Sequence, residues 1–178
     1  MWPKLNWLSL FVIFYSITEI LSRVEFTNIK CDCVDKEYCA VDQCYLKSIN
    51  RTYKYLSIKV NLLKPLVTNV MVNGAMLKRA NGYKPFLYNI TIDFCRFMKY
   101  RRSNPVALYA LGLLGTNTNL NHSCPYHGVM FVDKLPTSFI NHQITEILPF
   151  PEGDYMLEYR FSSENINRAV FQVYGTLS

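Results

Sequence analysis

Apolar and polar residues alternate between residues 86 and 94, and this pattern restricts the segment to an extended strand with one buried face. Side chains of a strand point alternately to the two sides of a sheet, so residues two apart share a face. The apolar face comprises Phe86, Tyr88, Ile90, Ile92 and Phe94. The polar face comprises Asn89, Thr91 and Asp93, which we expect to meet solvent.

The same pattern recurs along the chain and predicts an all-β fold. Glu152-Gly153-Asp154 is expected to form a turn, and Ser162–Asn165 is expected to form a hairpin loop. Many short antiparallel strands joined by such turns are typical of a β-sandwich. The predicted strands are Val24–Lys30, Gln43–Ile49, Tyr53–Leu62, Thr68–Lys78, Phe86–Phe94, Val129–Lys134, Tyr155–Phe161 and Asn167–Gly175.

One segment predicts a single short helix. Asn104 is a good N-cap, Pro105 suits the first turn, and Gly115 closes the run. The helix would be apolar nearly all round, so another part of the molecule must cover it. It either packs on the sheet or lids a cavity.

Six cysteines indicate three disulfides, because the count is even and an apolar leader precedes them. We expect Cys95 to pair with Cys124, and the N-terminal four to pair among themselves. The spacing of these four cysteines does not determine which of them pair. A zinc site built on Cys31 and Cys33 is the alternative, although the spacing is not that of a zinc finger or ribbon. The N-terminal cysteines are Cys31, Cys33, Cys39 and Cys44.

Residues 1–22 are expected to be a signal peptide, with Lys4 before an apolar run from Leu5 to Ile17 and cleavage after Ser22. The alternative is a membrane anchor, but about 20 apolar residues are needed to span a bilayer. Residues 23–178 would then be one secreted, extracellular domain. Three Asn-x-Ser/Thr sites predict N-glycosylation at Asn50, Asn89 and Asn121.

The net charge of +6 is unevenly distributed. Residues 103–132 carry no Lys, Arg, Asp or Glu, and the segment before them is basic. Its cations are Lys78, Arg79, Lys84, Arg96, Lys99, Arg101 and Arg102. These cations either form a solvated face or bind an anion. The anion would be the head group of an amphiphile or the surface of an anionic membrane. Nucleic acid is not expected as a partner, because the chain is expected to be secreted.

Signals for catalysis are weak. The histidines His122, His127 and His142 stand without a hydrolase motif, and no Gly-rich phosphate loop is present. We therefore expect no enzyme activity, no cofactor and no metal. A secreted hydrolase that uses His122 and His127 is the alternative.

Several motifs together resemble a large family of secreted insect proteins of unassigned function, abundant in flies and related to the lipid-recognition (ML) superfamily and to ganglioside-activator-like proteins. The resemblance covers nearly all of the mature chain. The motifs are Phe26–Cys31, Leu46–Tyr55, Asn81–Thr91, Asn121–Tyr126, Leu148–Tyr155 and Val173–Ser178.

The resemblance implies an immunoglobulin-like antiparallel β-sandwich, whose sheets splay to hold a hydrophobic ligand without catalysis. It also implies carriage of a pheromone or lipid in chemosensory tissue. Cys31, Cys44, Cys95 and Cys124 match the family, whereas Cys33 and Cys39 are additional. The implied pairing is Cys31–Cys44 with Cys33–Cys39.

We expect a binding protein for a small hydrophobic or amphiphilic, lipid-like ligand. Lys99, Arg101 and Arg102 would approach an anionic head group, and Leu108 and Leu111 would lie near the cavity mouth. The alternative is an extracellular protein with a solid core that contacts a membrane receptor and binds no small ligand. The candidate walls are Phe86, Tyr88, Ile90, Ile92, Tyr155, Leu157 and Tyr159.

Overall fold

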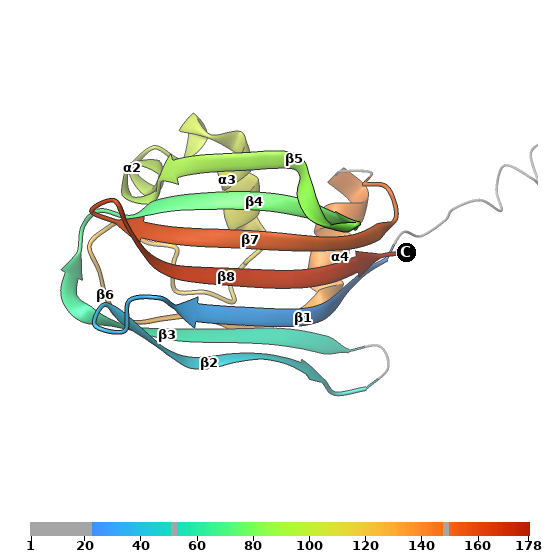
Figure 1. The fold of residues 1–178 in the computed structure, drawn as a ribbon, viewed down its shortest axis with the longest axis horizontal. Helices are drawn as coiled ribbons and strands as arrows, with labels where there is room; N and C mark the ends of the chain where they lie inside the picture. The colour runs from blue at the N-terminus through green and yellow to red at the C-terminus, as the bar shows by residue number, and fades with distance from the viewer. Residues whose placement is uncertain (1–22, 51–52, 148–149) are drawn as a thin grey trace, which may run out of the picture.

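The computed structural model describes residues 23–50, 53–147 and 150–178 as two antiparallel sheets with helices beside them (Figure 1). The predicted signal peptide lies outside the described residues. The strands are β1 (Val24–Cys33), β2 (Cys39–Ser48), β3 (Lys54–Val67), β4 (Met71–Ala80), β5 (Gly82–Asp93), β6 (Tyr126–Pro136), β7 (Gly153–Ser163) and β8 (Ile166–Leu177). All eight predicted strands are therefore confirmed, most of them longer than predicted.

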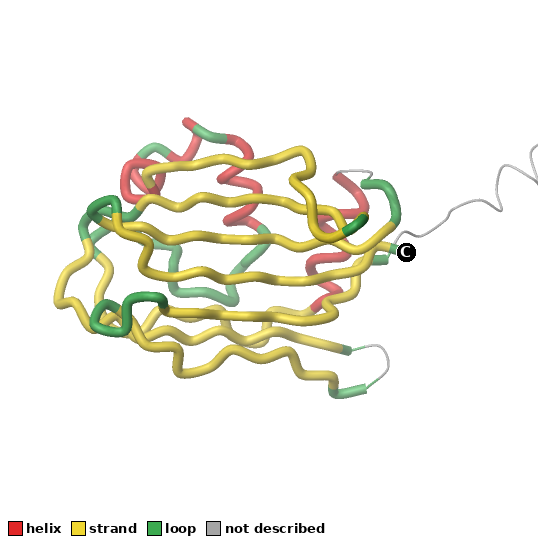
Figure 2. Tube along the Cα trace, viewed as in Figure 1, coloured by secondary structure: helices red, strands yellow, loops and turns green. Residues whose placement is uncertain are grey.

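The strands form a five-stranded sheet of order β1-β8-β7-β4-β5 and a three-stranded sheet of order β2-β3-β6 (Figure 2). Neighbouring strands pair antiparallel throughout both sheets. The predicted hairpin loop joins β7 to β8, and Glu164 and Asn165 adopt positive φ there. Positive φ at both central residues is the geometry of the two-residue turns that suit a twisted hairpin.

The two sheets are joined along one side. β1 belongs to the larger sheet and β2, the next strand in the chain, belongs to the smaller. Two disulfides link them, Cys31–Cys44 and Cys33–Cys39. This is the pairing that the family resemblance implies. All six cysteines are in disulfides, so no thiolate is left for the zinc site.

On the other side of the sandwich the chain crosses from β5 to β6 through helices. These are α2 (Phe94–Lys99), the 3₁₀ turn η1 (Arg101–Ser103) and α3 (Pro105–Gly112). Figure 1 shows α3 behind the five-stranded sheet. The expected Cys95–Cys124 disulfide is confirmed, and it ties the first turn of α2 to the segment just before β6.

The predicted helix is confirmed as α3, and its cap is as expected. The Asn104 side chain accepts a hydrogen bond from the Ala107 backbone N–H at 3.0 Å. The described residues also form two α-helices that were not predicted from the sequence. Phe94, which was expected to end a strand, begins α2, because the Asp93 carboxylate caps a helix there through the Arg96 N–H at 2.9 Å. The other is α4 (Thr137–Ile147).

Removal of the Cys95–Cys124 disulfide is expected to destabilise the fold more than removal of Cys33–Cys39. A disulfide restricts the unfolded chain more when it closes a longer loop, and the separations are 29 and 6 residues. The C95S/C124S variant should lose about 3–4 kcal/mol of unfolding free energy, and C33S/C39S about 2 kcal/mol. Urea denaturation followed by circular dichroism measures both. Equal losses would contradict the loop-length argument.

Candidate ligand-binding cavity

A cavity of about 660 Å³ lies between the two layers. Small-molecule sites in proteins typically enclose about 300–1,000 Å³ and are mostly apolar. The larger sheet lines it with residues of β4, β5, β7 and β8, including Val72, Met76, Ile90, Ile92, Leu157, Phe171 and Val173. The smaller sheet and the helices α3 and α4 line the opposite side, with residues that include Leu56, Val60, Met130, Val106, Ala110, Ile140 and Ile144.

Alternation along β7 builds one part of the wall, because every second residue from Tyr155 to Phe161 faces the cavity. These residues are Tyr155, Leu157, Tyr159 and Phe161. Between them, Glu158 and Arg160 form an ion pair at 2.7 Å, and Arg160 is largely exposed. Gly74 of the neighbouring strand β4 lies against the Tyr159 ring.

The helix α3 covers part of the cavity. Its lining residues include Val106, Ala110 and Leu111, and the Tyr109 hydroxyl donates to the Gln143 carbonyl of α4 at 3.1 Å. The two helices are thus linked directly. Of the two interpretations of this apolar helix, the structure favours the one in which it covers a cavity.

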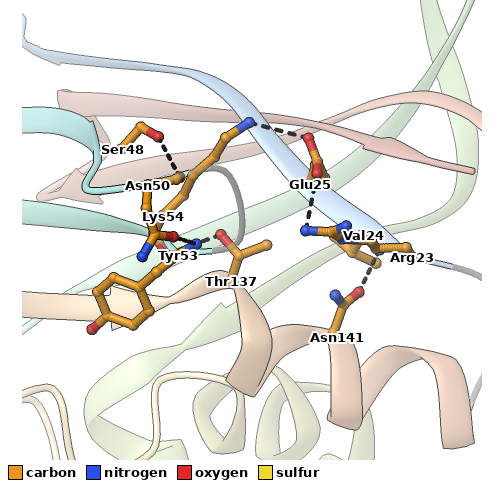
Figure 3. Close-up of polar contacts among 9 residues, drawn as sticks. All are labelled: Arg23, Val24, Glu25, Ser48, Asn50, Tyr53, Lys54, Thr137 and Asn141. Carbon is orange, nitrogen blue, oxygen red and sulfur yellow. Dashed lines mark hydrogen bonds and ion pairs between the residues drawn. The ribbon is translucent and has the colours of Figure 1, made fainter.

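Polar contacts fix α4 against both sheets (Figure 3). The Thr137 hydroxyl donates to the Lys54 carbonyl of β3 at 3.2 Å, and the Asn141 side chain accepts from the Val24 N–H of β1. Glu25 of β1 also pairs with the Lys54 ammonium at 3.1 Å. Ile140 and Ile144 then face the cavity, so α4 closes the end of the sandwich where β1 begins.

Seven of the nine residues predicted as ligand contacts line the cavity. They are Tyr88, Ile90, Ile92, Leu111, Tyr155, Leu157 and Tyr159. Phe86 lies beside the cavity wall, with its ring centroid 5.6 Å from that of Tyr155. The pairing of β4 with β5 is irregular at this point, and Leu87 has a φ of 58°, so the simple alternation does not extend to Phe86.

Leu108 and the three predicted head-group cations lie away from the cavity wall. Leu108 is 40% exposed and borders a small surface pocket with Arg101 and Asn121. The Arg101 guanidinium donates to the Asn121 side-chain oxygen at 2.6 Å and to its carbonyl at 3.2 Å. Lys99 and Arg102 are exposed. These positions favour the interpretation of the basic segment as a solvated face.

The sequence analysis missed the one charged residue among those that line the cavity, Arg168 of β8. It is only 9% exposed. Regular alternation along this strand would put Ala169, Phe171 and Val173 on one face and Arg168 on the other. A local irregularity between β7 and β8, which the amino-acid pattern does not reveal, changes that assignment.

Three of the tyrosines that line the cavity have a raised pKa. Burial raises the pKa of Tyr109 and of Tyr159, and it raises the pKa of Tyr126 to about 12. The Tyr126 hydroxyl donates to the Leu120 carbonyl at 3.0 Å and to the His122 carbonyl. These phenols therefore stay neutral at physiological pH. His122, one of the two histidines of the hydrolase alternative, contacts the carbonyl of its neighbour Ser123 at 2.8 Å.

The fold and the cavity together define an antiparallel, disulfide-linked β-sandwich with an apolar space between its sheets. A family model described as "Protein of unknown function (DUF1091)" matches residues 72–157, somewhat less than half of the chain. That segment runs from β4 into β7 and includes all of α3. It is similar to a family whose function is not assigned. No curated protein matches the chain.

Among the residues that the structure describes, no helix is both long enough and apolar enough to cross a bilayer.

Alkaline pH is expected to destabilise the fold through Tyr126. Its pKa is 10.0 in the unfolded chain and about 12 in the folded one, so the folded protein keeps a proton that the unfolded chain loses. Stability should therefore fall as the pH rises from 10.0 towards 12. In Tyr126→Phe this fall should be shallower, while stability at neutral pH drops by about 1–3 kcal/mol because two carbonyls lose their donor.

Urea denaturation at increasing pH tests this expectation. Tyr100→Phe is the matched control, because Tyr100 is 66% exposed. An alkaline profile of Tyr126→Phe identical to that of the wild type would show that another group is responsible.

Proposed function

We propose that this chain is a secreted binding protein for a small hydrophobic or amphiphilic, lipid-like ligand, and that it is not an enzyme. The observation that carries the proposal is the apolar cavity of about 660 Å³ between the sheets. The sequence motifs that resemble the lipid-recognition superfamily and secreted insect proteins support the same ligand class. Carriage in chemosensory tissue is the biological setting that this resemblance implies.

An empty cavity of this size would be costly. Protein interiors are close-packed, with few voids larger than a water molecule. Apolar side chains around an unfilled space lose packing contacts, so an empty cavity destabilises the fold. The space is therefore expected to hold an apolar occupant.

An opening to solvent is expected between β5 and α3. Tyr88 of β5 and Pro105 of α3 both line the cavity and are both exposed. A ligand that passes between them would enter along the side of the sandwich opposite the Cys31–Cys44 disulfide. The proposed walls, with Tyr88, Ile90 and Ile92 on one strand, would then be its first contacts.

Secretion is part of the proposal. Three disulfides are typical of proteins that fold in an oxidising compartment. All three predicted glycosylation sites are exposed: Asn50 before β3, Asn89 on β5 and Asn121 before β6. The sugar attaches to the side-chain nitrogen, so a glycan on Asn89 would leave its oxygen able to accept the hydrogen bond from Asn73 at 2.8 Å.

Native mass spectrometry of the protein secreted from insect cells, followed by organic extraction, tests the proposal. We expect a mass increase of about one lipid per chain, because the cavity volume falls within the usual range for one small ligand. A clean apo mass that does not change when fatty acids or sterols are added would contradict the proposal. It would favour the extracellular protein that contacts a membrane receptor without a small ligand.

A tryptophan placed in the cavity should compete with the ligand. Ala110→Trp, on the face of α3 that lines the cavity, should weaken ligand binding at least tenfold and leave the melting temperature unchanged or higher. Leu108 lies on the same helix and is 40% exposed, so Leu108→Trp should change neither the ligand affinity nor the melting temperature. If Ala110→Trp instead lowered stability by about 1–3 kcal/mol without affecting binding, the interior would be a packed core.

A further inference from the structure

Arg168 is the one charged residue among those that line the cavity, and it carries an unused hydrogen-bond donor. The residue is 9% exposed. Its Nε is the one buried side-chain nitrogen or oxygen in the described residues that has no hydrogen-bond partner. Buried donors in folded proteins are nearly always paired, so a lone one requires an explanation.

A β-bulge accounts for the position of Arg168. Phe161 pairs with Ala169 and Ser162 pairs with Asn167, which leaves Arg168 as an extra residue on β8. An extra residue of this kind disrupts the alternation and re-aims a side chain. Arg168 and its neighbour Ala169 accordingly both line the cavity, although they are consecutive in a strand.

The charge of Arg168 is already compensated. Its Nη1 pairs with the Asp35 carboxylate and its Nη2 lies 3.4 Å from the Glu164 carboxylate. The guanidinium also stacks over the Tyr38 ring, 4.7 Å from the centroid. The hydrogen bond from Arg168 lowers the pKa of Asp35, so this carboxylate remains charged at neutral pH. A ligand carboxylate beside the guanidinium would be repelled by the Asp35 and Glu164 carboxylates, which already offset the single positive charge of Arg168.

This end of the cavity is polar, whereas most of the rest is apolar. Ser162 and Ser163 also line it, and they pair with Asn167 and Ile166 next to Arg168. Thr176 also lines the cavity, but it lies at the opposite end of β8, where its hydroxyl already donates to Asp154 at 2.7 Å. The arrangement fits an elongated molecule with one polar end.

We propose that the Nε–H of Arg168 anchors the ligand by donating a hydrogen bond to one neutral oxygen at its end, as in a long-chain alcohol, aldehyde or ester. This inference rests on the proposed function and specifies its ligand class. The long apolar chain occupies the space between the sheets. A carboxylate is the less suitable end group, because Asp35 and Glu164 already neutralise the guanidinium.

Three probes of equal chain length separate the possibilities: hexadecane, hexadecanol and hexadecanoate, each used to displace a fluorescent lipid probe at neutral pH. The wild type should bind hexadecanol about tenfold more tightly than hexadecane, since one hydrogen bond to a charged donor accounts for about that factor. Hexadecanoate should bind no more tightly than hexadecanol.

Arg168→Lys keeps a cation beside Asp35 and removes the Nε–H. In this variant the preference for hexadecanol over hexadecane should fall to about one, while the affinity for hexadecane stays the same. Arg160→Lys is the matched control, since Arg160 is on the outer face of β7 and pairs with Glu158. Asp35→Asn removes one of the competing carboxylates and should raise the affinity for hexadecanoate relative to hexadecanol.

The outcomes distinguish this inference from the proposed function. Failure of all three probes to bind would overturn the carrier function and the anchor with it. Equal binding of hexadecane and hexadecanol to the wild type would leave the carrier intact and overturn the anchor, and this holds even if Arg168→Lys does not fold. Tighter binding of hexadecanoate than of hexadecanol to the wild type would overturn the assignment of a neutral end group.

Discussion

The architecture depends on where the two sheets are joined. β1 and β2 follow one another in the chain, belong to different sheets, and are linked by Cys31–Cys44 and Cys33–Cys39. The opposite side has no such direct link, because the chain reaches β6 from β5 only through α2, η1 and α3. A sandwich closed on one side and spanned by helices on the other can keep its sheets apart. The apolar space between them follows from this asymmetry.

Two kinds of contact give that space its character. The inner positions of the strands supply apolar and aromatic side chains. The helices are held by polar groups at their margins, such as Thr137 to β3 and Tyr109 to α4. These contacts hold the helices in place, and the Tyr109 ring also lines the cavity. Arg168 is the one charged residue among those that line the cavity, and its charge is offset by Asp35 and Glu164.

The strands could be predicted because alternation is a local property of the sequence. It located all eight of them and identified six lining residues on strands, such as Ile90 and Leu157. Features that depend on pairing with a particular neighbouring strand, or on a single helix-capping residue, were not predicted. The bulge that turns Arg168 inward is a matter of pairing with β7, and α2 is too short to show a helical period. For α4 a signal existed, since Ile140 and Ile144 have helical spacing.

The Cys95–Cys124 disulfide has a kinetic consequence. It joins α2 to the segment before β6, so the part of the chain that carries α3 is a closed loop fixed at both ends. If the cavity carries a ligand as proposed, that ligand would exchange while the loop stays anchored, through small displacements of α3. Residence time would then be set by how readily one short helix tilts, and reduction of a single covalent bond would shorten it.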